Sequence, residues 1–264
     1  MKPTDRRGAL RAGAAAAVAV AGTLATACGT EPRPAPPSAT APTPATARRP
    51  AAAPAVAPAP RRFPGRPDEI AHGPRDRPRV ALTFHGQGDP ALARTLLGQA
   101  EQAGARVTVL AVGSWLDDHP DLARRVLDGG HDLGNHTQHH VDVNAMTEAE
   151  AHAEIEACAT RLRRLTGSIG SWFRPSRTQH AAPAVLRAAR RAGYPHVLSY
   201  DVDSLDFTAP DAATVVRDVT GAVRAGSVVS LHFGYPVTAA ALPLLLADLD
   251  RRGLRAVTTT ELLT

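Results

Sequence analysis

Short apolar runs rich in β-branched residues alternate with longer stretches of helical periodicity from residue 78 onward. The runs are RVALTF (79–84), RVTVLAV (106–112), HVLSYD (196–201) and SVVSLH (227–232). The stretches between them carry helix signals, such as Thr147 and Glu150 at capping-box spacing. This alternation predicts an α/β fold of βα units with a mainly parallel sheet or barrel.

The first 28 residues have a different pattern. Arg6 and Arg7 precede an apolar stretch over residues 14–25, and small residues lead to Cys28 in the sequence LATAC. This order is typical of an export signal with a twin-arginine start, and the apolar stretch is too short to span a bilayer comfortably. LATAC resembles a bacterial lipobox. We therefore expect lipidation of Cys28, which anchors the protein to the outer face of the cell membrane, or else plain cleavage and secretion.

Residues 29–77 are rich in proline and alanine, with 12 of the chain's 23 prolines between residues 31 and 67. Such a composition predicts a disordered, extended linker. The chain has a net charge of +5, but residues 1–77 hold 12 Lys and Arg against 5 Asp and Glu, so residues 78–264 are close to neutral. We therefore expect no nucleic-acid partner for the domain of residues 78–264.

Reactive side chains follow several of the predicted strands. His85 and Asp89 follow the first strand and His232 ends the last of the four runs above, while GNHTQHH, FRPS and DVDSLDF follow other short segments. Because the carboxyl ends of parallel strands meet at one rim, these groups are expected to form one site.

The sequence HTQHH places His136 and His140 four residues apart. On one helical turn both imidazoles would point the same way, with His139 as an alternative partner or a solvated side chain. Two imidazoles suit a divalent metal such as zinc, which needs a third ligand and leaves a position open for water.

Several ordered motifs resemble the polysaccharide deacetylase family, the carbohydrate esterases with a NodB-type homology domain. They are VGSWLDDHPDLARRVLDGGHDLGNHTQHH, EIEACATRLRRLTG, FRPS, DVDSLDF, SVVSLHFG and RRGLRAVTTTELL. The resemblance covers residues 79–264. It implies a distorted, incomplete (β/α) barrel that binds one divalent metal, with zinc as the expected ion, and removes N- or O-acetyl groups from glycans.

The resemblance also implies roles for single residues. His136 and His140 match the histidine metal ligands, and Arg174 matches the arginine that holds the catalytic base. Asp206 matches the aspartate that orients the catalytic histidine, and His232 matches that histidine, which protonates the leaving group.

Substrate contacts are implied at two further positions. Leu231 is expected to line the pocket for the acetyl methyl group, and Phe207 stands where the family usually has tryptophan. Ser176 and Arg177 replace a frequent aromatic residue, but a backbone N–H there can still hold the oxyanion.

The first motif departs from the family pattern. The family usually has Thr-Phe-Asp-Asp-Gly-Pro, whereas Thr-Phe is followed here by His85 and Gly86. Gly86 and Gly88 give the loop freedom to bring Asp89 back as the third metal ligand, and His85 can serve as general base near neutral pH. Two alternatives stay open: Asp89 as base beside a two-histidine metal, and a site without activity.

Two functions follow from these alternatives. One is a metal-dependent deacetylase of an extracellular polysaccharide, with peptidoglycan, chitin-like chains and acetylated xylan all open as substrates. The other is a catalytically inactive protein that keeps the barrel and binds cell-wall glycan.

Overall fold

A parallel sheet forms the centre of the molecule in the computed structural model, which describes residues 57–264. Its strands run in the order β4-β3-β2-β7-β6. Their bounds are β2 (Arg79–Gly86), β3 (Thr108–Ala111), β4 (Asp132–Asn135), β6 (Val202–Asp203) and β7 (Val228–His232). The expected parallel architecture is therefore present, and β2 lies in its middle with apolar side chains buried on both faces.

Further short strands extend this sheet toward a barrel. β8 (Arg255–Val257) pairs with the first half of β2, beside the place where β3 pairs with its second half. β1 (Glu69–Ile70) and β5 (Val197–Leu198) pair with each other, and single bridges join Asn135 to Phe173 and Phe173 to Val197. The wall is thus curved but interrupted, as expected for a distorted, incomplete (β/α) barrel.

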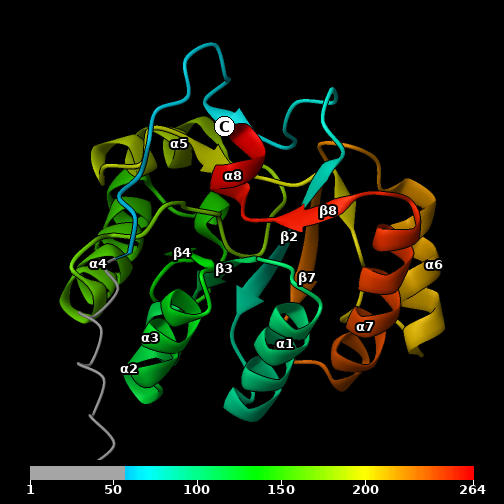
Figure 1. The fold of residues 1–264 in the computed structure, drawn as a ribbon. Coiled ribbons are helices and arrows are strands. Elements are labelled where there is room, and N and C mark those ends of the chain that lie inside the picture. The colour runs from blue at the N-terminus through cyan, green and yellow to red at the C-terminus, as the bar shows by residue number, and fades with distance from the viewer. Residues whose placement is uncertain (1–56) are drawn as a thin grey trace, which may run out of the picture. The chain divides into compact units, whose positions relative to one another are not determined.

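Helices surround the strands (Figure 1). They are α1 (Pro90–Gln102), α2 (Gly113–Asp118), α3 (Asp121–Asp128), α4 (Glu148–Thr166), α5 (Pro183–Arg191), α6 (Ala212–Ala222), α7 (Pro236–Arg251) and α8 (Thr259–Leu263), with a 3-10 turn η1 (Val143–Ala145). The expected Thr147/Glu150 capping box begins α4. α8 closes the end where β2 begins, and the β2 arrow points away from it. The carboxyl ends of the strands are therefore left free for a site.

The segment before β2 packs on the barrel, which corrects the expected disordered linker over its final part. Ala57, Phe63 and Ile70 are buried. The ring of Phe63 stacks on Trp172 at 5.5 Å between centroids, and its backbone N–H donates to His196. Apolar side chains within a proline-rich stretch suffice to hold it, because they bury area against an existing core. Residues 1–56, with the expected signal and Cys28, lie outside the described residues.

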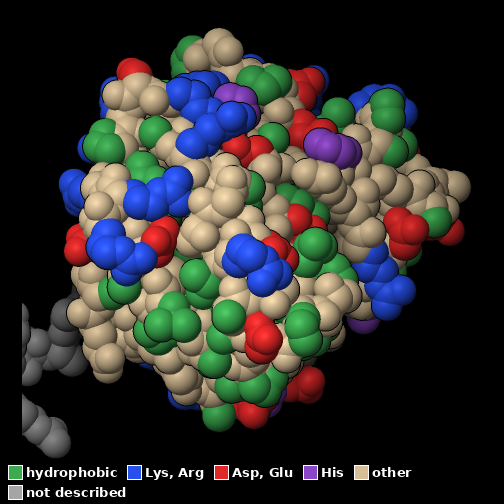
Figure 2. Space-filling view, turned by 90° about the vertical axis from the view of Figure 1, so that its right-hand side faces the viewer, with side chains coloured by type: hydrophobic (Ala, Val, Ile, Leu, Met, Phe, Trp, Pro, Cys, Tyr) green, Lys and Arg blue, Asp and Glu red, His purple; other side chains and the backbone are tan. Residues whose placement is uncertain are grey.

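Charged side chains of both signs are interspersed on the face that carries α6 and α7 (Figure 2). Arg217 pairs with Asp218, and Arg251 pairs with Asp248. Among residues 57–264, no helix combines the length and the apolar character that crossing a bilayer requires.

Candidate active site

His85 is the last residue but one of the buried strand β2, and it lies against β7. The parallel register sets it beside His232 on β7, and the two rings stack at 4.4 Å between centroids. Its Nε2 lies 3.0 Å from the hydroxyl of Ser230. Because residues 230 and 232 of a strand point to the same face, β7 presents two polar groups to His85.

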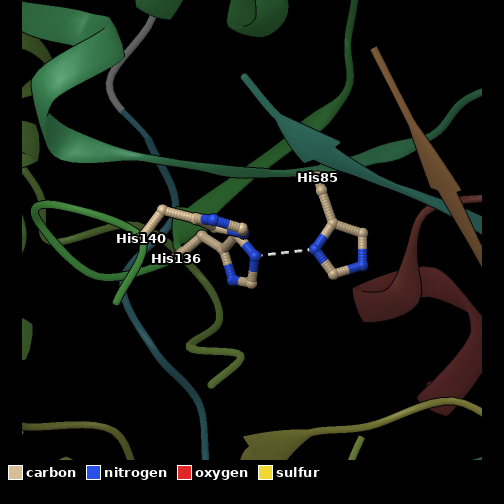
Figure 3. Close-up of side chains that lie close together, drawn as sticks. All are labelled: His85, His136 and His140. Carbon is tan, nitrogen blue, oxygen red and sulfur yellow. Dashed lines mark hydrogen bonds between the residues drawn. The ribbon is translucent and has the colours of Figure 1, made fainter. Parts of the chain in front are cut away.

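Three histidines form a cluster at this end of the barrel (Figure 3). One ring nitrogen from each of His85, His136 and His140 lies within 4.8 Å of the others. His85 Nδ1 is 2.6 Å from His136 Nε2, and the His140 ring lies 5.0 Å from the His136 ring. The expected pair His136 and His140 is therefore brought together, with His85 as its third member.

The turn after β4 brings His140 back to His136 without a helix. Thr137 and His140 both have left-handed φ, at 67° and 54°. The hydroxyl of Thr137 accepts from the His140 N–H and donates to Ser176, which holds this strained turn. The helical turn expected for this pair is thus replaced by a loop, because side-chain bonds fix a backbone that helix geometry does not allow.

Hydrogen bonds assign the tautomers of the two closest rings. His136 Nδ1 lies 3.0 Å from the carbonyl oxygen of Arg174, so this nitrogen carries a proton and donates it. His136 Nε2 is then bare and accepts from His85 Nδ1–H. His85 Nε2 is left to accept from the Ser230 hydroxyl. Both rings are neutral in this arrangement.

Burial supports the neutral forms. Desolvation lowers the pKa of His85 and of His136 well below the ordinary value, and the neighbouring histidines and Arg174 disfavour a positive charge on each ring further. Burial and Arg177 also lower the pKa of His140. Neutral imidazole is the form that ligates a metal.

The donor set of this cluster fits a zinc-like divalent ion. Three neutral imidazole nitrogens are a known zinc ligand set that leaves one position open. Two nitrogens on one tetrahedral zinc lie about 3.4 Å apart, so the 2.6 Å between His85 and His136 would have to widen by roughly 0.8 Å. His85 lines the pocket, so part of its ring borders open space rather than packed side chains.

Asp89 does not reach the histidines, which corrects its expected role as third ligand. Its carboxylate accepts from the N–H of Ala91 and caps α1, and the residue is exposed. The loop before it is fixed outward, because Trp115 Nε1 donates to the Gly88 carbonyl. A Cβ on Gly88 would lie 2.5 Å from the Cα of Gly234, so the two glycine backbones touch.

His232 and Asp206 form a hydrogen-bonded pair, as expected. His232 Nδ1 donates to Asp206 Oδ1 at 2.6 Å. Asp206 is buried, and its other oxygen accepts from the His232 backbone N–H and the Thr238 hydroxyl. The carboxylate therefore fixes the ring and leaves its Nε2 free for chemistry.

Arg174 is a buried guanidinium without a carboxylate partner among the described residues. Its Nε and Nη2 donate to the carbonyls of Leu198 and Ser199, and Nη1 has no hydrogen-bond partner in the described part of the chain. Burial lowers its pKa to about 10. His85, an imidazole, stands where the resemblance expects the carboxylate that this arginine would hold.

A pocket of about 320 Å³ opens beside these groups. His85, His140, His232 and the expected substrate contact Phe207 all line it; the others are Arg177, Thr178, Gln179, Tyr200, Asp203 and Ser230. Two of the three clustered histidines and His232 thus share one opening, while His136 and Asp206 are buried behind them.

Leu231 lies on the other face of β7, which corrects its expected place in the acetyl pocket. It is buried in the main apolar core, and Ser230 occupies the pocket instead. The missed residue had a sequence signal, because Ser230 stands two positions before His232 and strand side chains alternate.

Comparison with known proteins identifies the family. A family model described as polysaccharide deacetylase matches residues 72–197. A peptidoglycan-N-acetylglucosamine deacetylase of Bacillus cereus is 31% identical over 196 residues, which cover 70% of this chain and 87% of that protein. The chain belongs to the polysaccharide deacetylase family. A chitooligosaccharide deacetylase of Bradyrhizobium sp. is 30% identical, covering 66% of this chain and 85% of the relative.

Solved structures of the polysaccharide deacetylase family share the fold. A family 4 carbohydrate esterase from Streptomyces lividans matches with a TM-score of 0.63 and 25% identity, covering 67% of this chain and 91% of that chain. A family 4 pseudoenzyme from Bacillus anthracis matches with a TM-score of 0.71 and 20% identity, covering 75% of this chain and 70% of that chain. The barrel fold is therefore confirmed, and it occurs both in an esterase and in a pseudoenzyme.

Proposed function

We propose that this chain is a metal-dependent hydrolase that removes acetyl groups from a cell-wall or extracellular polysaccharide. One observation carries the proposal: the three-histidine cluster lies beside the His232–Asp206 pair, and His85, His140 and His232 line one pocket. A metal centre that activates water and an oriented histidine that transfers protons are together sufficient for one known route of acyl hydrolysis. The deacetylase names of the relatives support the substrate class.

His85, His136 and His140 are the proposed ligands, and zinc is the proposed ion because imidazole donors favour it over magnesium or calcium. A zinc ion in such a site lowers the pKa of water and polarises an acyl carbonyl. Ser230 orients His85, and the Arg174 carbonyl orients His136.

His85 fits a ligand role better than the general-base role expected from its position in the sequence. Both of its nitrogens are engaged, Nδ1 within the cluster and Nε2 with Ser230. No carboxylate joins the cluster in the described part of the chain. The proton of the attacking water therefore falls to His232, whose ring stacks on His85.

His232 would serve both proton transfers. It takes a proton from water as the water oxygen bonds to the acetyl carbon, and Asp206 stabilises the resulting imidazolium. It then gives the same proton to the sugar nitrogen or oxygen as the bond from that atom to the acetyl carbon breaks. Acetate and a free amine or hydroxyl are the products.

Metal content and acetate release test this proposal together. The purified chain, supplied with zinc, is expected to hold about one equivalent and to release acetate from peptidoglycan, chitin oligomers or acetylxylan. A His136→Ala, His140→Ala double variant is the control and is expected to do neither. Equal zinc in the two proteins would remove the metal site.

A second function has its own observation. Within residues 57–264, Arg174 has no carboxylate partner and the cluster contains imidazoles alone, which favours a catalytically inactive protein that binds glycan. Glycan binding with full zinc occupancy and no acetate from any of the three substrates would establish this function instead.

Attachment to the outer face of the membrane is also proposed. It is supported by the sequence around Arg6, Arg7 and Cys28 and by the proline-rich stretch that follows as a tether. A Cys28→Ser variant is expected to release the protein into the medium or to leave an uncleaved precursor. Unchanged fractionation together with a mature N-terminus that carries no lipid would exclude the anchor.

A further inference from the structure

Asn135 is the last residue of β4 and directly precedes His136, one of the proposed ligands. Its side chain is fully buried and makes three hydrogen bonds. Oδ1 accepts from the backbone N–H of Thr137 at 2.9 Å, and Nδ2 donates to the Ile155 carbonyl at 2.8 Å and to the Tyr194 hydroxyl at 3.1 Å. The amide therefore uses both of its donors and its acceptor, which fixes its orientation.

The hydroxyl of Tyr194 decides which way the Asn135 amide points. It donates its proton to the Ile169 carbonyl at 2.6 Å, because a carbonyl oxygen can only accept. The phenol oxygen is then left to accept, so it faces the NH₂ of Asn135 rather than the amide oxygen. Burial raises the pKa of Tyr194 well above its ordinary value, which keeps the proton on the phenol. Tyr194 lies between α5 and β5, 59 residues beyond Asn135.

A second chain of hydrogen bonds also ends at Thr137. The Ser176 hydroxyl donates to the Val141 carbonyl and accepts from the Thr137 hydroxyl at 3.0 Å. The Thr137 oxygen in turn accepts from the His140 N–H at 3.1 Å. The backbone N–H of Thr137 thus belongs to the chain from Tyr194, and its hydroxyl belongs to the chain from Ser176.

The turn needs both chains because its backbone is strained. Thr137 and His140 have left-handed φ, and threonine is branched at Cβ, so the turn would relax toward ordinary backbone angles without them. Relaxation would move His140 away from His136, whose own ring is held separately by the Arg174 carbonyl. The two chains of hydrogen bonds therefore keep the imidazoles of His136 and His140 together.

We propose that Tyr194 is a positioning residue of the metal site and acts through Asn135 on the turn that carries His140. The proposal rests on the proposed function, because it concerns the affinity for zinc. Tyr194 is buried among apolar side chains of α4 and α5 and does not line the pocket. Phenylalanine would fill the same apolar space, which isolates the hydroxyl as the group to test.

Tyr194→Phe removes the hydroxyl and keeps the ring. Competition with a chelator is expected to show zinc binding about 10-fold weaker, the lower end of the range for partners outside the ligand shell. Amide hydrogen exchange of the metal-free chain, followed by NMR, is expected to be about 5- to 10-fold faster at Thr137 and His140, the usual effect of losing one hydrogen bond. A residue with a merely structural role would change neither quantity.

Thr166→Val is the matched control. Thr166 is buried at the end of α4, and its hydroxyl donates to backbone carbonyls as that of Tyr194 does. These carbonyls belong to α4 and the turn after it, and the bonds do not lead to Asn135. Both variants lose one buried hydroxyl and are expected to melt about 2 to 4 °C lower. Thr166→Val should nevertheless keep the zinc affinity and the amide exchange of wild type.

Wild-type zinc affinity in Tyr194→Phe would overturn the proposal. So would an equal loss of affinity in Thr166→Val, because lower stability alone would then explain it. A wild type that binds no zinc removes the proposed function, and exchange at Thr137 then decides whether Tyr194 holds the turn. Faster exchange in Tyr194→Phe would keep its positioning role, and equal exchange would overturn it.

Discussion

His85 Nδ1 lies 2.6 Å from His136 Nε2, with a proton of His85 between them. These are two of the three nitrogens that face one another in the cluster. The His85 ring would have to hold its proton on Nε2 for Nδ1 to ligate a metal, and Ser230 is placed to accept that proton. Moving the ring proton of His85 from Nδ1 to Nε2 would therefore convert the hydrogen-bonded pair into two metal ligands.

Replacing His85 is expected to weaken zinc binding, whereas replacing Asp89 is expected to leave it unchanged. His85→Ala should weaken zinc binding more than about 100-fold, above the range for an outer-shell partner. Asp89→Ala should keep zinc and lose about 1 kcal/mol of unfolding free energy, because Asp89 caps α1. Competition titration with a chelator and chemical denaturation measure the two effects. Asp89→Asn, which keeps a capping oxygen, is the control, and loss of zinc in Asp89→Ala would restore the ligand role expected from sequence.

Ser230→Ala is expected to weaken zinc binding about 10- to 100-fold without removing a ligand, because the hydroxyl fixes the ring of His85. The measurement is the same chelator competition. Ser227→Ala changes another buried serine next to β7, whose hydroxyl contacts Arg75 and Asp201 rather than the cluster. It should leave zinc affinity unchanged. An equal loss of zinc affinity in the two variants would show that Ser230 affects zinc through the packing of β7 and not through its hydrogen bond to His85.

The stability of the metal-free chain is expected to fall as pH falls from about 7.5 to 5.5. Burial lowers the pKa of His85 and His136 in the folded state, so the unfolded chain takes up protons first, near the ordinary pKa of 6.5. Stability is therefore complete above that value and declines below it, by up to about 1.4 kcal/mol per pH unit for each histidine.

Urea unfolding at several pH values in the presence of a chelator measures this slope. A His85→Phe variant removes one of the two buried imidazoles and should have a shallower dependence. His119→Gln removes a histidine that lies outside the cluster, so it is a control that should keep the wild-type slope. A slope unaffected by His85→Phe would contradict the linkage.

Asp206→Asn is expected to lower kcat by about 10² to 10⁴-fold, the range for general acid–base catalysis, with KM and zinc content little changed. The amide cannot stabilise the imidazolium of His232 as the carboxylate does. Acetate release and elemental analysis measure the two quantities. Thr238→Val removes only one hydrogen bond to Asp206 and should cost far less. Loss of zinc in Asp206→Asn would place the aspartate in the metal site instead.

The alternation of apolar runs and helical stretches was enough to predict the parallel architecture, because strand and helix periods are local properties of the chain. It also placed the reactive residues, since parallel strands end at one rim. His136, His232 and Asp206 lie where the sequence put them for this reason. The same strand alternation could have predicted that Ser230, rather than Leu231, lines the pocket with His232, because residues two apart on a strand share a face.

Tertiary contacts decided what the local pattern could not. The loop TFHGQGDP contains glycines that permit many paths, and the contact of Gly88 with Gly234 and the hydrogen bond from Trp115 hold it where the Asp89 carboxylate caps α1, away from the histidines. Ser176, 39 residues along the chain, accepts from the Thr137 hydroxyl that holds His140 in its left-handed turn, and no periodicity predicts this contact. Sequence spacing fixes where a strand ends, whereas the direction of the loop beyond it depends on residues far along the chain that happen to pack against it.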